Sequence, residues 1–311
     1  MPAPETPTYV GRFAPSPTGP LHFGSLLAAI ASYLQARAHN GRWLLRIEDI
    51  DPPREQQGAD RLIVATLEAY GFEWDGPVTY QSNNERRHRE VLDELLKRGV
   101  AYPCACSRRD LAGAPTGPLG AIYPGTCRSG CNAEETAVRV LTHDRRITFH
   151  DGLQGHYGQR LESESGDFVI WRRDGLVAYH LAVVVDDHDQ GVTEIVRGID
   201  LLDSTPRQIH LQQLCGFATP RYVHIPVATN PDGQKLSKLT GAAAIDAQHP
   251  AETLVSALRV LRQKPPGNLA SASLQEIWRW ATGHWTLTPL AGRKTVQGGQ
   301  DSMLQRENRL R

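Results

Sequence analysis

The chain has 311 residues, of which 40% are hydrophobic and 22% are charged, and 34 lysines and arginines balance 34 aspartates and glutamates. These proportions are typical of a soluble globular protein with a sizeable core, built as one large or two medium domains. A net charge of zero argues against broad, nonspecific nucleic-acid binding but permits a local basic face. The N-terminus lacks the basic and apolar regions of a secretory signal, and no apolar run approaches the roughly 20 residues that span a bilayer. We therefore expect a cytoplasmic protein, and the absence of a GxxxxGK(S/T) loop argues against a P-loop ATPase.

The first expected elements are a strand over Tyr9–Ala14 and a helix over Leu26–Ala38. Between them, the stretch Arg12–Ser25, RFAPSPTGPLHFGS, is crowded with proline and glycine, as in a turn. A strand, a glycine-containing turn and a helix begin a nucleotide-binding α/β unit, in which the helix N-terminus offers free N–H groups to a phosphate. His22 would direct a donor toward the same anion, and Gly24 would let a flat ligand such as a purine approach the backbone. Taken alone, an HxG tripeptide is more often an incidental part of a connection.

A buried strand is expected over Trp43–Glu48. Its carboxyl end is where ligands bind in open α/β sheets, and Glu48 is suited to hold the ammonium group of an amino acid. A solvated strand end is an equally good interpretation of Glu48 alone. Amphipathic helices are expected over Arg54–Tyr70 and Asn84–Arg98, with a loop and a short strand over Gly71–Gln81, and we assign no catalysis to them.

Four of the five cysteines fall between residues 104 and 131. In a chain without an export signal, such clustering favours a metal over disulfides. Cys104, Cys106 and Cys127 are plain candidates for a tetrahedral thiolate site, which zinc fills best. The intervening stretch has few large apolar residues, so a metal would supply its order. Ligand chemistry alone selects Cys131 as the fourth ligand, and reduced cysteines without metal are the alternative.

The second half of the chain has further strand patterns at Val138–Val140, Ile147–Asp151, Asp167–Trp171, Ala178–Val185 and Tyr222–Thr229. Because AYHLAVVV at Ala178–Val185 is nearly continuously apolar, it predicts a parallel strand buried on both faces. Helices are expected over Asp200–Gln213, Ala251–Leu261 and Ser273–Thr282. The polar stretch Ala291–Arg311 is expected to be loosely ordered.

A glycine-preceded KLSKL segment follows the last of these strands and contains Lys235, Ser237 and Lys238. Lysines on a flexible loop can close over a triphosphate and neutralise charge as its α-phosphate is attacked, and one such donor is typically worth about 10²–10³ in rate. A KxSK tetrapeptide alone is a weak signal. Following RFAPSPTGPLHFGS in the right order, it is strong.

Together these segments resemble the class I aminoacyl-tRNA synthetases. PSPTGPLHFGS resembles their HIGH signature, with Phe23 and Ser25 in place of its second and fourth letters, and KLSKL resembles their KMSKS loop. RFAPSPTG, LLRIEDID and the segment GDFVIW…EIVRG narrow the resemblance, which covers roughly residues 8–260, to the glutamyl-tRNA synthetase branch. The resemblance implies an α/β fold: a Rossmann-like nucleotide-binding domain with a zinc-containing insertion and a C-terminal helical region. We expect the domain's halves at 8–100 and 166–230, the insertion at 101–165, the signature loop and a helical stem-contact region at 231–290, and a loose tail at 291–311.

The resemblance also implies the roles of individual residues. Arginines bind carboxylates bidentately, so a pocket with two arginines near the carboxylates and Glu48 on the ammonium is complementary to glutamate. The implied glutamate-binding residues are Arg12, Phe13, Ala14, Pro15, Ser16, Glu48, Tyr179 and Arg197. The implied ATP-binding residues are His22, Gly24, Lys235, Ser237 and Lys238, with His22 and Lys238 as catalytic residues and Mg²⁺ as the companion of ATP.

For the metal site, a shorter member of this branch holds its zinc with three cysteines and a tyrosine. On that pattern, Tyr123 replaces Cys131 as the fourth ligand beside Cys104, Cys106 and Cys127. The expected zinc is structural rather than catalytic.

The chain stops about 50 residues after the resemblance ends, which leaves no room for the anticodon-binding region of a full glutamyl-tRNA synthetase. The resemblance therefore implies a monomeric enzyme that activates L-glutamate with ATP without tRNA. It then transfers the glutamate to queuosine in the anticodon loop of tRNA(Asp). Two alternatives stay open: a compact glutamyl-tRNA synthetase that charges a tRNA 3′ end, and a noncatalytic RNA-binding paralogue. A nucleotidyltransferase of another HxGH family is a weaker third.

Overall fold

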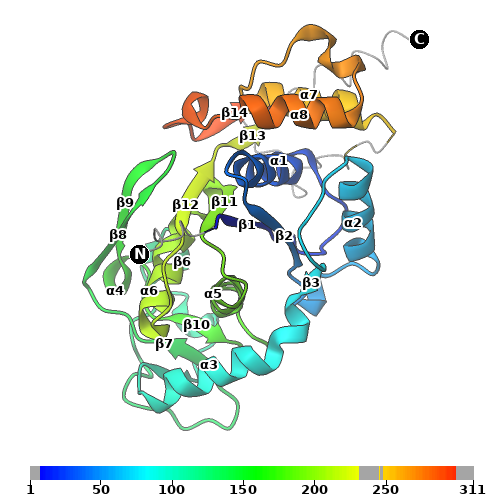
Figure 1. Ribbon diagram of the computed structural model, residues 1–311. Coiled ribbons are helices and arrows are strands. Elements are labelled where there is room, and N and C mark those ends of the chain that lie inside the picture. The colour runs from blue at the N-terminus through cyan, green and yellow to red at the C-terminus, as the bar shows by residue number, and fades with distance from the viewer. Residues whose placement is uncertain (1–7, 231–244, 246–247, 299–311) are drawn as a thin grey trace, which may run out of the picture.

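The computed structural model describes residues 8–230, 245 and 248–298 (Figure 1). The first half-sheet is parallel and consists of β1 (Val10–Phe13), β2 (Arg42–Ile47) and β3 (Thr79–Tyr80) in the order β1-β2-β3. Helix α1 (Phe23–Ala38) connects β1 to β2 and packs on both strands. The predicted sequence of strand, turn and helix is thereby confirmed, although the helix begins three residues before the expected Leu26.

The second half-sheet has the order β11-β12-β8-β9, with β11 (Glu194–Gly198), β12 (Arg221–Ile225), β8 (Arg146–Asp151) and β9 (Gly155–Arg160). Only the β8–β9 pairing is antiparallel. Thr193 joins the half-sheets, because its N–H donates to the Val10 carbonyl at 2.9 Å and its hydroxyl accepts the Val10 N–H at 2.9 Å. The carboxyl ends of β1, β2 and β11 therefore meet at one edge, as in an open α/β sheet.

Helices surround the two half-sheets and lie in two groups (Figure 1). Helices α3 (Glu85–Lys97), α5 (Tyr179–Asp189) and α6 (Thr205–Cys215) share one hydrophobic core. Helices α7 (Pro250–Val260) and α8 (Leu274–His284) pack on α1 in the other core. There Tyr33 meets Trp43 edge-on at 5.1 Å and Trp278 at 4.7 Å between ring centroids, so aromatic packing joins the C-terminal helices to the first half-sheet.

The expected strand over Ala178–Val185 is wrong, because these residues belong to the buried helix α5. Leu181 to Asp187 are all buried, between α3, α6 and β10 (Phe168–Trp171). A helix buried on every side shows no polar stripe, so its apolar run cannot be told from a buried strand by periodicity. The two aspartates in its last turns, Asp186 and Asp187, are also buried and pair with His88 and Arg12. Over Leu181 to Asp187, therefore, no exposed polar face marks the helix.

A separate antiparallel sheet has the order β10-β7-β4, with β7 at Ala137–Val140 and β4 at Ala101–Cys104. Of the expected insertion at 101–165, β4 and β7 belong to this sheet, whereas β8 and β9 belong to the second half-sheet. A small hairpin, β5 (Thr116–Gly117) with β6 (Gly120–Ala121), lies between β4 and β7 in the chain, and α4 (Leu161–Glu164) precedes β10. Short 3₁₀ helices occupy Pro52–Arg54, Gln81–Asn84, Arg109–Leu111, Ile199–Ser204, Gly267–Ser271 and Thr288–Leu290.

Three expected boundaries need correction. Helix α2 (Ala59–Ala69) begins after the left-handed Gly58 (φ 77°) instead of at Arg54. The strand expected over Tyr222–Thr229 is interrupted at Pro226, and its second part is β13 (Val227–Thr229). The tail expected to be loose over 291–311 contributes β14 (Thr295–Gln297), which pairs in parallel with β13, and its residues 299–311 lie outside the described part of the chain. Among the described residues, no helix is long and apolar enough to cross a membrane.

Candidate active site and cysteine cluster

A cavity of about 570 Å³ opens at the edge where the carboxyl ends of β1, β2 and β11 meet. Its walls come from the turn after β1, the start of α1, the end of β2, the first residue of α5 and the chain after β11. All eight residues expected to bind glutamate line this one cavity, as do His22 and Gly24. Residues far apart in the sequence are therefore brought together as the sequence hypothesis requires.

His22 is the N-cap of α1, and its Nδ1 accepts the Ser25 N–H at 3.1 Å. Its Nε2 lies 3.0 Å from the Ser25 hydroxyl. Since Nδ1 is an acceptor here, the ring proton belongs to Nε2. Gly24 is the second residue of the helix and lines the cavity, so helix start and histidine face the same space.

Four charged side chains form a buried network at the ends of β1 and β2. Arg12 Nε lies 3.0 Å from Asp187 Oδ1, and Arg46 Nη2 lies 2.8 Å from the same oxygen. Arg46 Nη2 is also 3.6 Å from Glu48 Oε1. Burial raises the pKa of Asp187, but the two guanidiniums outweigh burial and hold it below its usual range.

In Glu48, unlike in Asp187, the effect of burial on the pKa outweighs that of the neighbouring arginines. Its side chain is 8% exposed, and burial raises its pKa to about 7, against the opposing effect of Arg46 and Arg12. Because burial disfavours the ionised form of Glu48, a cation that binds beside it at the cavity wall stabilises that carboxylate. The site can therefore bind an ammonium group there.

Arg197, on β11, is 5% exposed and lacks a carboxylate partner in the part of the chain that the structure describes. Its Nε donates to His224 Nε2 at 3.0 Å and its Nη2 donates to the Thr205 hydroxyl at 2.8 Å. Its Nη1 is buried without a hydrogen-bond partner among the described residues. A buried, unpaired guanidinium N–H on a cavity wall is an anion-binding group.

Lys235, Ser237 and Lys238, the candidates from KLSKL, lie outside the described residues. The strand before them, β13, is described, and Val227 and Ala228 line the cavity.

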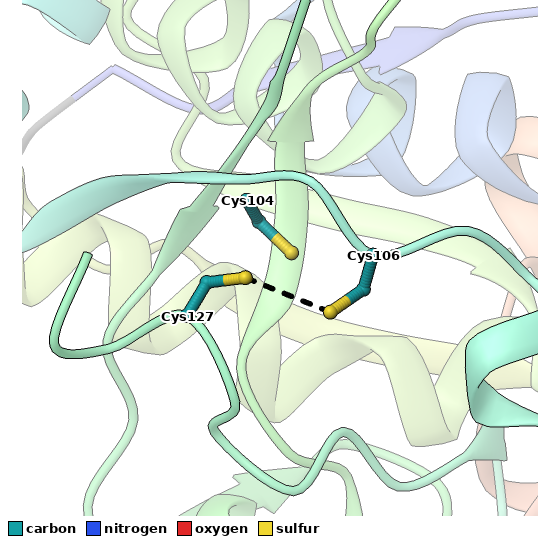
Figure 2. A group of neighbouring side chains, drawn as sticks. All are labelled: Cys104, Cys106 and Cys127. Carbon is teal, nitrogen blue, oxygen red and sulfur yellow. Dashed lines mark hydrogen bonds between the residues drawn. The ribbon is translucent and has the colours of Figure 1, made fainter. Parts of the chain in front are cut away.

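The cysteine cluster lies in the insertion (Figure 2). The sulfurs of Cys104, Cys106 and Cys127 point toward one another and lie within 4.8 Å of one another, and Cys106 Sγ is 3.6 Å from Cys127 Sγ. Tetrahedral zinc with Zn–S bonds of about 2.3 Å places sulfurs about 3.8 Å apart, so the cluster fits such an ion. The Tyr123 hydroxyl completes it, at 3.4 Å from Cys104 Sγ and 3.6 Å from Cys106 Sγ.

Cys131 packs against this group but does not belong to the mutually close set, and its Sγ contacts the Pro103 carbonyl at 3.5 Å. All five cysteines are free thiols. The geometry favours three thiolates and a phenol oxygen as the donor set.

Sequence reasoning missed three side chains that support the cavity. No role was assigned to Asp187, Asp151 or His224 from the sequence, although Asp151 and His224 are fully buried behind Arg197. The charge of Arg46 in RIED was a usable signal for Asp187, since a buried arginine needs a carboxylate. For Asp151 and His224 no local motif existed, because 73 positions separate them.

Comparisons with known proteins identify the family of the chain. The model of the class I tRNA synthetases (E and Q), catalytic domain, matches residues 9–117 and 123–278. A glutamate tRNA ligase from Elizabethkingia meningosepticum, solved in complex with its amino acid, aligns over 98% of this chain and 70% of its own with a TM-score of 0.78 at 22% identity, which shows a shared fold. The fold and the cavity thus define a class I tRNA synthetase catalytic domain.

Relatives with higher sequence identity show which family within this class the chain belongs to. A glutamyl-Q tRNA(Asp) synthetase from Pseudomonas aeruginosa is 53% identical over 91% of this chain and 95% of its own length. One from Aromatoleum aromaticum is 51% identical over 97% of each chain. The chain belongs to the family of glutamyl-Q tRNA(Asp) synthetases.

Proposed function

We propose that this chain activates L-glutamate with ATP, without requiring tRNA, and transfers the glutamyl group to queuosine in the anticodon loop of tRNA(Asp). The observation that carries the proposal is the identity of about half of all residues to glutamyl-Q tRNA(Asp) synthetases over more than nine-tenths of both chains. The cavity supplies the chemical support, because it combines an unpaired guanidinium N–H with a carboxylate of raised pKa.

In this proposal, glutamate lies between Glu48 and Arg197. Glu48 takes the ammonium group, and Arg197 takes a carboxylate through its free Nη1. Arg12, Phe13, Ala14, Pro15, Ser16 and Tyr179 line the remaining walls. Glutamine would leave the buried guanidinium without a counter-charge, a loss that favours glutamate by about 10²-fold or more.

The first step joins the substrates. An α-carboxylate oxygen of glutamate attacks the α-phosphorus of ATP, the bond from that phosphorus to the bridging oxygen breaks, and pyrophosphate leaves. His22, at the start of α1, stabilises phosphate charge, and Gly24 gives the nucleotide close access to the backbone. Lys235, Ser237 and Lys238 are assigned to the triphosphate on their motif alone. Mg²⁺, when bound with ATP, screens the charge of the departing pyrophosphate.

In the second step a ring hydroxyl of queuosine attacks the carbonyl carbon of the glutamyl adenylate. An ester forms, AMP leaves with the bridging oxygen, and the hydroxyl proton passes to solvent. No protein side chain becomes a covalent nucleophile in either step. Both substrates and the RNA are those of the cytoplasm, where we infer that the protein acts as a monomer.

Zinc is proposed as a structural ion held by Cys104, Cys106, Tyr123 and Cys127. The support is the convergence of these donors in the insertion. When bound, the ion would fix the segment between β4 and β7, which has little apolar core of its own.

The test is glutamate-dependent ATP–pyrophosphate exchange without RNA, followed by transfer of labelled glutamate to tRNA(Asp) with and without queuosine. We expect exchange without RNA and labelling of the queuosine-containing tRNA(Asp) only. Labelling of tRNA(Glu) would instead indicate a compact synthetase that charges a 3′ end. Absence of exchange with every amino acid would indicate a noncatalytic protein.

A further inference from the structure

Behind Arg197, two fully buried residues on neighbouring strands form a chain of hydrogen bonds. Asp151, at the end of β8, and His224, on β12, are both 0% exposed. Asp151 Oδ2 lies 2.6 Å from His224 Nδ1, and His224 Nε2 lies 3.0 Å from Arg197 Nε. The chain thus runs from a carboxylate through an imidazole to the arginine at the cavity wall.

These contacts determine where the imidazole proton lies. The Nε–H of arginine can only donate, so His224 Nε2 must accept, and its single ring proton belongs to Nδ1, where it is donated to Asp151. Asp151 is itself fixed, because its Oδ1 accepts the backbone N–H groups of Leu153 and Gln154, each at 2.9 Å. Burial lowers the pKa of His224, and the charge of Arg197 adds to this effect, which keeps the ring neutral.

A neutral acceptor has a consequence for charge. A carboxylate behind Arg197 would neutralise the guanidinium internally, as Asp187 does for Arg12. An imidazole satisfies the Nε–H and fixes the direction of the guanidinium without placing a carboxylate in direct contact with it. The Thr205 hydroxyl is likewise a neutral acceptor, for the Nη2–H of Arg197 at 2.8 Å. Nη1 is left for the ligand.

We propose that His224, oriented by Asp151, is a positioning residue that holds Arg197 free of a directly contacting carboxylate and aimed at the side-chain carboxylate of the substrate, and so contributes to selecting an anionic amino acid. This inference rests on the proposed function for the identity of that carboxylate. The two arginines of the cavity then have different roles: Arg12 belongs to an internal ion pair, and Arg197 binds the negatively charged group of the substrate.

The first measurement is the tautomer of His224, by long-range ¹H–¹⁵N correlation on the whole protein without ligands. We expect a neutral ring protonated at Nδ1 at neutral pH. A ring protonated at Nε2, or a charged ring, would overturn the inference. Because this spectrum needs no substrate, it decides the matter even if glutamate were not activated, an outcome that would defeat the proposed function separately through the exchange assay.

The second measurement uses Asp151→Asn, which keeps the shape of the side chain. Its amide would donate to Nδ1 and force the ring proton onto Nε2, directly against the Nε–H of Arg197. Loss of one charge-assisted hydrogen bond corresponds to a KM for glutamate raised by roughly 10- to 100-fold, with the KM for ATP changed by less than about twofold. His224→Leu should act in the same direction, and His224→Gln, whose carbonyl can accept from Arg197, should recover part of the loss.

A matched control is available on α3. His88 is also 0% exposed and lies 2.8 Å from the carboxylate of Asp186, yet it does not line the cavity. His88→Leu should therefore lower stability without changing the KM for glutamate. If folded Asp151→Asn keeps the wild-type KM for glutamate, or if His88→Leu raises it equally, the positioning role is wrong.

Discussion

Arg12 Nε lies 3.0 Å from Asp187 Oδ1, although 175 positions separate the two residues. The pair joins the first strand of one half-sheet to the last turns of α5, and both side chains are 5% exposed. Arg46 shares the same carboxylate at 2.8 Å, so one aspartate compensates two buried arginines.

Asp187→Asn should therefore destabilise the fold strongly. Removing one partner from a buried ion pair leaves an uncompensated charge, which costs about 3–5 kcal/mol. Urea unfolding measures this loss. Asp189→Asn is the matched control, because Asp189 is more exposed (31%) and pairs with Arg87 at 3.3 Å, an interaction worth about 1 kcal/mol or less. Equal losses in the two variants would contradict the assigned role of Asp187.

Arg197→Ala should strongly reduce glutamate activation. Truncating a buried charged hydrogen-bonding partner costs about 2–5 kcal/mol, which corresponds to a loss of roughly 30-fold to several thousand-fold in kcat/KM for glutamate. Pyrophosphate exchange measures it. Arg221→Ala serves as the control, because this arginine on β12 is 68% exposed and pairs with Glu194 away from the cavity. Full exchange activity in Arg197→Ala would remove this residue from the substrate site.

Glu48 should make glutamate binding depend on pH. Its pKa is raised to about 7, so below that pH the ligand-free protein carries the neutral acid, which cannot pair with an ammonium group. The substrate ammonium stays charged over this range, so binding must expel the Glu48 proton. Affinity should then rise with pH and level off above about 7, with KM increasing up to about tenfold for each unit below it.

Glu48→Gln tests the origin of that dependence. The variant should bind glutamate weakly and equally at pH 6 and pH 8, as measured by calorimetry. A slope that persists in Glu48→Gln would assign the titration to another group.

Zinc content should separate the two candidate fourth ligands. Cys127→Ala removes a central donor and should lose the ion, and Tyr123→Phe should weaken its retention against a chelator. Cys131→Ala should keep the wild-type stoichiometry, because Cys131 is not one of the mutually close sulfurs and its Sγ contacts the Pro103 carbonyl. Elemental analysis of the purified variants measures this. Zinc lost from Cys131→Ala but kept in Tyr123→Phe would reverse the assignment.

Much of the cavity lining could be predicted from sequence because its residues lie in contiguous segments with strong local rules. The turn from Arg12 to Gly24 and the strand ending at Glu48 are of this kind, and both line the cavity as expected. Helix α5 could not be recognised, because Val183, Val184 and Val185 are buried on all sides and show no period. The pairing of Asp151 with His224 could not be found either, since it depends on the register of β8 beside β12.

The pairing of β14 with β13 anchors a strand that lines the cavity. The Gly298 N–H donates to the Thr229 carbonyl at 2.7 Å, and the Ile245 N–H donates to the Leu21 carbonyl, beside His22, at 3.1 Å. The described chain therefore stops at residue 230, directly after a strand that lines the cavity, and Ile245 lies beside another wall of the same cavity.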